Sequence, residues 1–354
     1  MKDMIVRTRA NVRALTGIDC DNAWVVVDKD KLTFYTDFRY IPMAHRVAPS
    51  LKVRDIKHFA PDVKRIWGGR GGTGRRIGFE KGISVALFEK LKKILPRVKF
   101  VDVTRDIERR RAVKGADEIA KMRAASDLNV EIWKEASAKF RPGMTERKMA
   151  CIIRSMMFER GEGEAFETIV CVGANAAECH HVPDDTVWDG RTPVLVDMGV
   201  KLDGYCSDMT RNFVPGAKCP VPGAGKPKIP SLYRKVYDVV LRANRAAIAA
   251  VKPGVTGKTL DKVARDLIRK EGFGKCFGHS LGHGVGLEVH EAPNASKKSD
   301  WTLKPGMFVT IEPGIYLEGN LGVRIEDLVL VTDSGCEVLT SAAPVDFGAS
   351  ASQS

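Results

Sequence analysis

Residues 141–145 read RPGMT and residues 252–256 read KPGVT, so a short pattern recurs 111 residues later. In both copies the proline and glycine stand between two stretches with helical periodicity, and the threonine is placed as the N-cap of the second helix. Gly161 ends the second helical stretch of the first copy, and Gly272 has the same place in the second. We therefore expect two helix pairs of the same design in a duplicated region.

The duplication continues beyond the helices. Residues 178–183 (ECHHVP) and 288–293 (EVHEAP) share the pattern Glu-x-His-x-x-Pro. An apolar strand with one acidic residue follows each segment, and a second acidic strand follows that one. The acidic residues are Asp197 and Asp208 in the first half, and Glu312 and Glu326 in the second. We expect two similar α/β halves that each contribute two carboxylates to one shared centre.

A small α/β domain is expected before the duplicated region. Residues 23–27 and 32–35 predict a hairpin, and residues 84–94 predict a helix. A long amphipathic helix begins near Ala116, and its apolar face holds Ile119, Met122, Ala125, Ile132 and Ala136. The fold class is therefore α+β.

The expected boundaries are 1–110 for the N-terminal domain, 111–347 for the duplicated domain and 348–354 for a tail. Fraying of the chain is expected from about residue 341. The Pro- and Gly-rich residues 214–230 are expected to join the two halves as a surface loop.

The composition favours a soluble globular protein. Of the 354 residues, 44% are hydrophobic and 29% charged, and no apolar run approaches the roughly 20 residues of a membrane span. The first residues lack the apolar core of a secretory signal, so we expect a cytoplasmic protein with no membrane partner. Eight cysteines without a Cys-x-x-Cys pair fit reduced thiols.

Two features could indicate nucleic-acid or nucleotide binding, and we interpret both as ordinary. The net charge is +13, but no aromatic stacking pattern accompanies the basic residues, so we expect a solvated basic face and no nucleic-acid partner. The basic cluster contains Arg105, Arg109, Arg110, Arg111 and Lys114. Residues 69–74 satisfy G-x-G-x-x-G, but a strand rather than a helix is expected after them, which predicts a plain loop.

Asp197 and Asp208 lie on an expected hairpin that turns at residues 201–204 (KLDG). If the turn is centred on this segment, the two acids face each other directly; if its last two residues form the turn, they are diagonal neighbours. Both registers place two carboxylates about 5 Å apart on one face of the sheet. Because two ionised carboxylates this close are costly to bury, a bound cation is expected between them.

Glu312 and Glu326 interrupt two further strands that are apolar enough to be interior. Arg324 shares the face of Glu326, so a plain salt bridge from this arginine to a glutamate is the alternative for that pair. Five of the seven histidines fall in residues 278–291 or at His180-His181. Carboxylate ligands with one imidazole are typical of sites for Mn²⁺, Co²⁺ or Fe²⁺, and not of thiolate zinc sites. Two of the carboxylates remain to bridge, which implies two ions.

These motifs resemble metallopeptidase family M24, which includes prolidase (Xaa-Pro dipeptidase), aminopeptidase P and methionine aminopeptidase. The resemblance covers about residues 111–347, on the motifs VDMG (196–199), DMTR (208–211), GHGVGL (282–287), IEPG (311–314) and VRIED (323–327). It implies the pita-bread (creatinase/aminopeptidase) fold of two pseudo-symmetric halves, with a small creatinase-type N-terminal domain. Residues 35–40 (YTDFRY) are similar to the proline-directed branch. Creatinase shares this fold but lacks the metal ligands, which are all present here.

The resemblance implies a dinuclear metal site. Asp197 would bind one ion in bidentate fashion, and Asp208 and Glu326 would bridge the two. His283 and Glu312 would complete the ligands of the other ion. The cofactor is expected to be two divalent ions, Mn²⁺ first, with Co²⁺, Zn²⁺ or Fe²⁺ as alternatives.

The resemblance also implies catalytic and substrate-binding roles. Glu312 would be the general base for the attacking water. His290 and His180 would contact the scissile carbonyl and steer protons, and His290 would thereby also bind substrate. His279 and Arg324 would line the side of the pocket that takes proline.

The expected function is hydrolysis of the Xaa-Pro bond in dipeptides or at the N-terminus of longer peptides. A methionine aminopeptidase-like exopeptidase and a non-catalytic binding protein on the same fold are the alternatives. Relatives suggest a homodimer. Residues 11–17 resemble an early family segment, so the strand and helix that usually precede it are expected to be missing, and the loop 214–230 is expected to be longer than usual.

Overall fold

The structure, a computed structural model, describes residues 3–69, 74–215 and 229–345. Its contacts divide the chain into two compact units, Met1–Arg111 and Ala112–Ser354.

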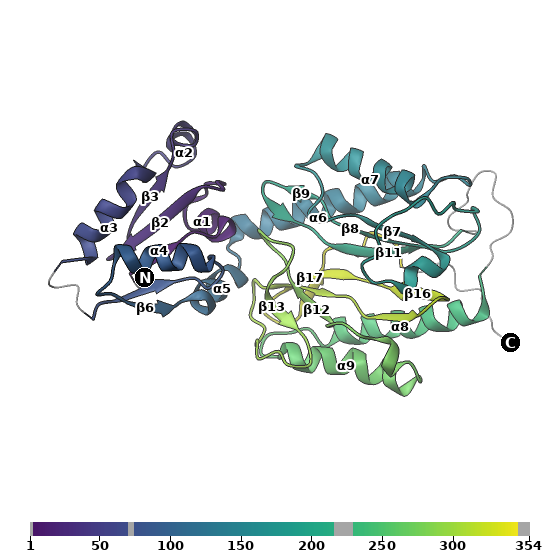
Figure 1. The fold of residues 1–354 in the computed structure, drawn as a ribbon. Helices are drawn as coiled ribbons and strands as arrows, with labels where there is room; N and C mark the ends of the chain where they lie inside the picture. Colours follow the sequence, from purple (N-terminus) through teal and green to yellow (C-terminus); the bar gives the residue numbers. More distant parts are fainter. Residues whose placement is uncertain (1–2, 70–73, 216–228, 346–354) are drawn as a thin grey trace. The chain divides into compact units, whose positions relative to one another are not determined.

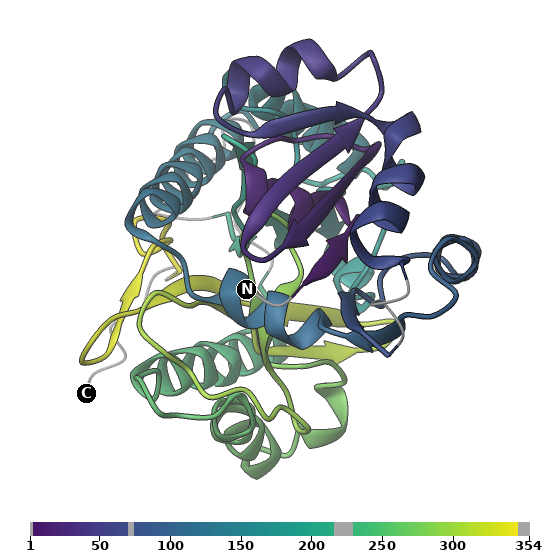
Figure 2. The same cartoon turned by 90° about the vertical axis from the view of Figure 1, so that its left-hand side faces the viewer.

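The first unit is built on a six-stranded mixed sheet with the order β4-β3-β2-β1-β5-β6. Its strands are β1 (Met4–Val6), β2 (Ala23–Asp28), β3 (Lys31–Thr36), β4 (Lys52–Asp55), β5 (Arg76–Phe79) and β6 (Lys99–Asp102). Figure 1 and Figure 2 show these strands in purple to blue, with helices beside them.

Alternation of apolar residues along the central strand β2 gives the sheet two buried faces. Val25 and Val27 face a core shared with α1 (Arg9–Thr16), α2 (Ile41–Val47) and α5 (Thr104–Ala112). Trp24 and Val26 face the opposite core, which α3 (Phe59–Trp67) and α4 (Val85–Ile94) complete after the short helix η1 (Ile56–His58). The first unit is therefore a three-layer α/β domain.

The predicted elements of the first unit are present. The hairpin β2–β3 turns at Lys29-Asp30, which have φ of 47° and 65°, and α4 follows the N-cap Ser84. Strand β5 follows residues 69–74 as expected, although residues 70–73 lie outside the described part of the chain. A strand, β1, does precede residues 11–17, so the expectation of a missing initial strand is wrong.

Two helix pairs open the two halves of the second unit. They are α6 (Ala116–Ser137) with α7 (Glu146–Arg160), and α8 (Ser231–Ala249) with α9 (Gly257–Lys270). Thr145 accepts a hydrogen bond from Lys148 N, and Thr256 accepts one from Thr259 N, both at 3.1 Å. These caps satisfy amide groups that the first turn leaves unpaired, and they confirm the predicted helix starts.

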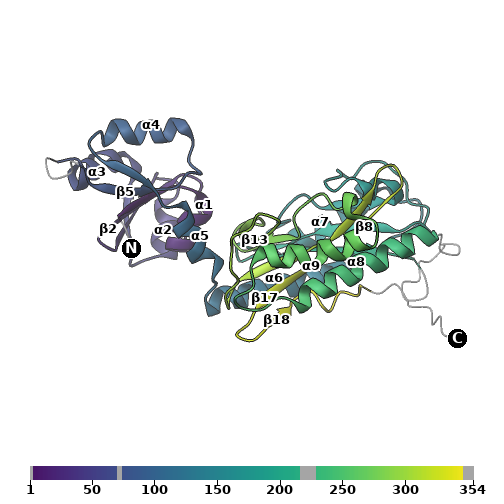
Figure 3. The same ribbon diagram turned by 90° about the horizontal axis from the view of Figure 1, so that it is seen from below.

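The strands of the second unit lie between the helix pairs (Figure 1, Figure 3). The first half has the sheet β11-β8-β7, and the second half has β14-β17-β18 with the hairpins β15–β16 and β12–β13. The bounds are β7 (Ile169–Val172), β8 (Val194–Met198), β9 (Lys201–Leu202), β10 (Tyr205–Cys206), β11 (Met209–Phe213), β12 (Gly282–Gly284), β13 (Glu291–Ala295), β14 (Phe308–Ile311), β15 (Gly314–Leu317), β16 (Leu321–Arg324), β17 (Asp327–Val331) and β18 (Cys336–Val338). Short helices η3 (Gly173–Ala177) and η4 (Gly274–Cys276) complete the set. Each half buries its own helix pair against its own strands, as the repeat predicts.

Two expectations about the second unit are wrong. Lys114 is not on a solvated basic face: its Nζ is buried and pairs with Glu291 Oε1 at 2.7 Å. Residues 341–345 are not frayed, because Ala343 is buried and its carbonyl accepts a hydrogen bond from Arg211 Nε at 3.0 Å. Both contacts join residues that are far apart in the chain.

Parts of the expected loop and tail, residues 216–228 and 346–354, lie outside the described residues. The cysteines that the structure describes are free thiols. In the same residues, no helix combines the length and the apolar character of a membrane span.

Candidate active site

The hairpin of Asp197 and Asp208 has the second of the two predicted registers. Asp203 and Gly204 form its turn with φ of 48° and 77°, the left-handed values of a type I′ turn. Thr210 therefore pairs with Asp197 across β8 and β11, and Asp208 lies one position before β11. The two acids are diagonal neighbours near the same end of the sheet.

Glu312 and Glu326 come from neighbouring strand ends of the second half. Ile311 of β14 pairs with Asp327 of β17, so Glu312 directly follows one strand where Glu326 directly precedes the other. Thr310 Oγ1 donates a hydrogen bond to Glu312 at 3.2 Å. The β14–β17 pairing therefore brings the second pair of acids together.

His283 is presented by the short strand β12, which lies close against β14. A Cβ at Gly282 would stand 1.8 Å from Thr310 O, so this approach requires glycine. His283 Nδ1 lies 3.1 Å from the carbonyl oxygen of Gly284, which can only accept, so Nδ1 carries the hydrogen. The lone pair on Nε2 then faces carboxylate oxygens of Asp208 and Glu312 at 3.6 and 3.3 Å.

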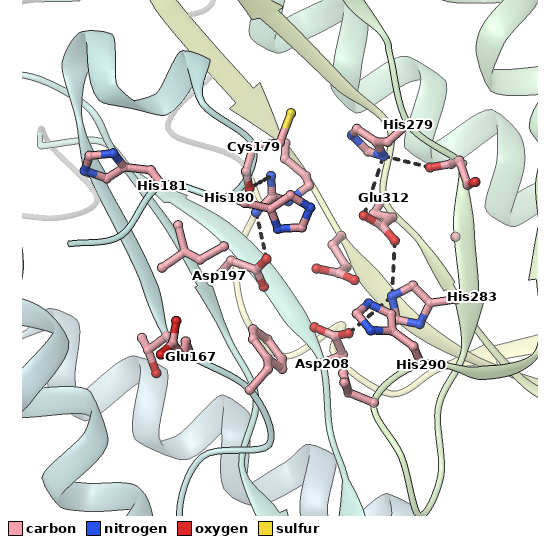
Figure 4. Close-up of a pocket in the computed structure, with 18 of the residues that line it drawn as sticks. Glu167, Cys179, His180, His181, Asp197, Asp208, His279, His283, His290 and Glu312 are labelled. Atoms are coloured by element: carbon pink, nitrogen blue, oxygen red, sulfur yellow. Dashed lines mark hydrogen bonds and ion pairs between the residues drawn. The ribbon is translucent and has the colours of Figure 1, made fainter. Parts of the chain in front are cut away.

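All of the expected site residues line one cavity of about 560 Å³ (Figure 4). They are Asp197, Asp208, His283, Glu312, Glu326, His180, His279, His290 and Arg324. One ligand atom each from Asp208, His283 and Glu326 lies within 4.8 Å of the others. The fold therefore gathers carboxylates from both halves around a histidine of the second.

Burial and mutual repulsion disfavour the charged forms of these carboxyl groups. Burial, then the neighbouring acids, raise the pKa of Asp208 and of Glu326 well above the ordinary range. Burial is also the main cause that raises the pKa of Glu312 to about 8, although Arg324 opposes it. Burial and the nearby His290 lower the pKa of His283 to about 4, which keeps the imidazole neutral.

The residues fit a divalent metal centre. Asp197 Oδ1 is buried without a hydrogen-bond partner, and the His283 lone pair faces carboxylate oxygens, so both atoms lack a positive partner. Within the described ranges, Arg324 is the only lysine or arginine in ion-pair distance of the four acids. Oxygen donors with one imidazole are ligands that hard and borderline divalent ions prefer.

Arg324 is held by a buried network. Its Nη2 donates to Asp197 Oδ2 at 2.7 Å, its Nε to Thr210 Oγ1 at 3.0 Å, and Thr210 in turn donates to Glu326 at 2.6 Å. The ion-pair partner is therefore an aspartate, and not the glutamate considered as the alternative. Arg324 orients two of the candidate ligands at once.

Tyr316, which sequence reasoning missed, contacts two of the residues that line the cavity. Arg324 Nη1 donates to its hydroxyl at 3.0 Å, and the hydroxyl lies 2.9 Å from His279 Nε2. His279 Nδ1 faces the carbonyl of Ser280, so Nε2 accepts the tyrosine hydrogen. The available signal was the β15–β16 hairpin, in which Gly314 pairs with Arg324 and Tyr316 lies two residues further on the same face.

The three expected site histidines besides His283 differ in their surroundings. His279 is neutral, because burial and Arg324 lower its pKa to about 4. The His290 ring packs edge-on against His283, with 4.3 Å between centroids. His180 is exposed to the cavity, and no hydrogen-bond partner holds its ring in the described part of the chain.

Comparison with known proteins gives a consistent match over both units. Residues 120–333 match the model of metallopeptidase family M24, and residues 2–113 match that of the creatinase/prolidase N-terminal domain. The uncharacterized peptidase YqhT of Bacillus subtilis is 32% identical over 95% of this chain and 93% of its own length. The Xaa-Pro dipeptidase of Pyrococcus furiosus is 34% identical over 90% of this chain and 86% of its own.

A solved structure supports the same match. The crystal structure of an X-Pro aminopeptidase from Thermotoga maritima is 32% identical, covers 97% of both chains and superposes with a TM-score of 0.84. The α+β pita-bread fold with a creatinase-type N-terminal domain is thereby confirmed.

Proposed function

This chain belongs to metallopeptidase family M24, and from that premise we propose that it hydrolyses the peptide bond before proline. The substrates are Xaa-Pro dipeptides or longer peptides with proline in second position. The observation that carries the proposal is one cavity in which acids of both halves meet His283, with four further histidines in its lining. Similarity over almost the whole length to an Xaa-Pro dipeptidase and an X-Pro aminopeptidase supports the substrate class.

We propose two divalent ions as cofactor. Their ligands would be Asp197, Asp208, His283, Glu312 and Glu326. When bound, such ions lower the pKa of a water molecule and polarise a carbonyl. The donor set of four carboxylates and one imidazole favours Mn²⁺, with Co²⁺, Zn²⁺ or Fe²⁺ as alternatives.

The chain's own residues would handle the proton. Glu312 accepts a proton from the attacking water and later releases it to the leaving nitrogen. His180 and His290 donate to the scissile carbonyl oxygen and hold it in place. These roles need groups that reach the same point, and all three residues line the same cavity.

Recognition of proline must come from shape, because an Xaa-Pro bond has no amide hydrogen to bind. His279 and Arg324 would line this side of the pocket. The Arg324–Tyr316–His279 hydrogen bonds hold His279 in one orientation. Because the His279 ring is held in one orientation, its surface can match the fixed shape of the proline ring.

The proposal is tested with metal-loaded protein on Xaa-Pro, Xaa-Pro-Yaa and Met-Ala-Yaa peptides. We expect release of the N-terminal residue from the proline peptides, abolished by a chelator and by Asp208→Ala. The surface variant Asp185→Asn is the control, because Asp185 is exposed and pairs with Arg147, which is not a candidate ligand. Release from the methionine peptide alone, or from none with any of the four metals, would refute the proposal.

We also propose a cytoplasmic homodimer, on the family resemblance and, for the location, on the free thiols of the described cysteines. Light scattering coupled to gel filtration measures the oligomeric state. A monomer at micromolar concentration would contradict the dimer.

A further inference from the structure

The segment between η3 and Thr186 carries two adjacent histidines with different surroundings. His180 faces the cavity beside Asp197, whereas His181 is turned away from the metal ligands (Figure 4). Because no hydrogen bond holds the His180 ring in the described structure, its orientation depends on the backbone that carries it. Whatever fixes this segment therefore also places His180.

Glu146 holds the segment in place through hydrogen bonds. It is the first residue of α7, and its side chain is fully buried. One carboxylate oxygen accepts hydrogen bonds from Val172 N at 2.6 Å and from Asn175 Nδ2 at 2.9 Å. The other faces His181 Nε2 at 2.7 Å and accepts from Asp184 N at 3.2 Å. A single carboxylate thus joins α7, β7, η3 and the histidine segment.

His181 lies between two carboxylates. Its Nε2 faces Glu146, and its Nδ1 lies 3.2 Å from Glu178. A neutral imidazole has one N–H, so only the imidazolium donates to both acids. Burial alone would lower the pKa of His181, but the hydrogen bonds to Glu146 and Glu178 outweigh it and raise the pKa.

A second metal site is the competing explanation, because ligand atoms of Glu146, His181 and Asp184 lie within 4.8 Å of one another. Both oxygens of Glu146 already accept hydrogen bonds from buried donors, and Asp184 accepts from Thr186 N at 2.7 Å. A cation would displace these donors and leave them unpaired, which is costly in a buried place. The contacts therefore favour a structural role for these residues. We call the hydrogen bonds of Glu146 with Val172, Asn175, His181 and Asp184, together with the contact between His181 and Glu178, the clamp.

We propose that Glu146 and His181 are positioning residues, which hold the backbone of their segment so that His180 points at the substrate carbonyl. The inference rests on the proposed peptidase function and adds two residues outside the metal ligands to it. Loss of the clamp lowers kcat and leaves the bound metal in place, because neither residue touches a candidate ligand.

The test compares His181→Ala and His181→Gln with wild type and with Asp185→Asn. Asp185 lies in the same segment but pairs with Arg147 at the surface. Glutamine keeps a donor near the position of Nε2, so it retains the bond to Glu146. We expect His181→Ala to lower kcat about ten- to hundredfold with little change in KM, as for other residues that orient an active group. His181→Gln should recover most of this loss, and Asp185→Asn should match wild type.

A further variant, Glu178→Gln, tests the clamp at its exposed end, where folding is not at risk: the Glu178 side chain is 74% exposed. The charged groups that face the His181 ring are Glu146 from α7, and Glu178 and Asp184 from its own segment. Deprotonation of His181 removes one of its two donated hydrogen bonds, so kcat should fall as pH rises through the pKa of His181. Removing the charge of Glu178 lowers this pKa, so the fall in kcat should move to lower pH. An unchanged pH profile would count against the clamp.

Metal content separates the remaining outcomes. Elemental analysis should give the same number of ions per chain in wild type and in His181→Ala; one ion fewer in the variant would establish the metal site and overturn the clamp. Unchanged kcat in His181→Ala, with an active wild type, would overturn the positioning role alone. A wild type that cleaves no Xaa-Pro peptide would overturn the proposed function, and this inference with it.

Discussion

At the scale of single residues, the centre holds more negative charge than the protein neutralises. Asp197, Asp208, Glu312 and Glu326 converge, and Arg324 is their one arginine or lysine partner among the described residues. Without ions, Glu312, Asp208 and Glu326 respond by holding protons more tightly than exposed acids do. Metal ions and protons therefore compete for the same oxygens.

This competition predicts how the stability of chelated protein depends on pH. The pKa of Glu312 is about 8 in the folded chain against 4.5 ordinarily, so between these values the folded state holds a proton that the unfolded state has lost. Its stabilising contribution is complete below about pH 4.5 and is lost as pH rises through about 8. The free energy of unfolding should fall by up to about 1.4 kcal/mol per pH unit from this one group.

Urea unfolding of wild type and Glu312→Gln, both with chelator, measures this slope. Glutamine cannot bind the proton, so the variant should lose less stability than wild type between pH 5 and pH 8. Equal slopes would mean that Glu312 binds no extra proton in the folded state.

At the scale of elements, β12 brings His283 to the acids only because it lies directly on β14. The Cβ of an alanine at 282 would overlap the carbonyl oxygen of Thr310, whereas one at 278 would meet nothing within 4 Å. Gly282→Ala should therefore displace β12 and weaken metal binding, at a cost of about 1–3 kcal/mol or more in stability.

Gly278→Ala is the matched control, since it adds the same methyl group to the same loop in open space. Calorimetric titration with Mn²⁺ and thermal unfolding of both variants check the prediction. Equal metal affinity in the two variants would show that β12 tolerates displacement.

At the scale of the whole molecule, the candidate ligands come from both halves of the second unit, so bound ions would cross-link the halves. Asp197 and Asp208 come from the first half, and His283, Glu312 and Glu326 from the second. An ion that binds all of them can bind only the folded chain. Each ion should therefore raise the free energy of unfolding by about 2.7 kcal/mol at a hundredfold excess over its Kd.

Unfolding followed over a series of Mn²⁺ concentrations measures this stabilisation. Asp208→Ala should abolish most of it, and Asp185→Asn should retain it. Stabilisation that survives in Asp208→Ala would place the ions elsewhere in the protein.

The sequence by itself determined the features that depend on nearby residues. The Pro-Gly-x-Thr repeat predicted both capped helices, α7 and α9, because an N-cap is set by the few residues around it. The apolar strands interrupted by an acid predicted Asp197 and Glu312, because an acid in an interior strand needs a partner wherever the strand lies. The duplicated order of these signals was enough to predict two similar halves around one centre.

Only the tertiary structure decided which partner each buried polar group has. The sequence left two registers open for the hairpin, and reasoning from it missed Tyr316. It also placed Lys114 on a solvated face and offered a glutamate as the ion-pair partner of Arg324. These partners are joined by folding: Lys114 meets Glu291 across 177 positions, and Arg324 meets Asp197 across 127. A buried charge is costly without an opposite charge beside it. Which opposite charge lies beside it depends on how the whole domain packs.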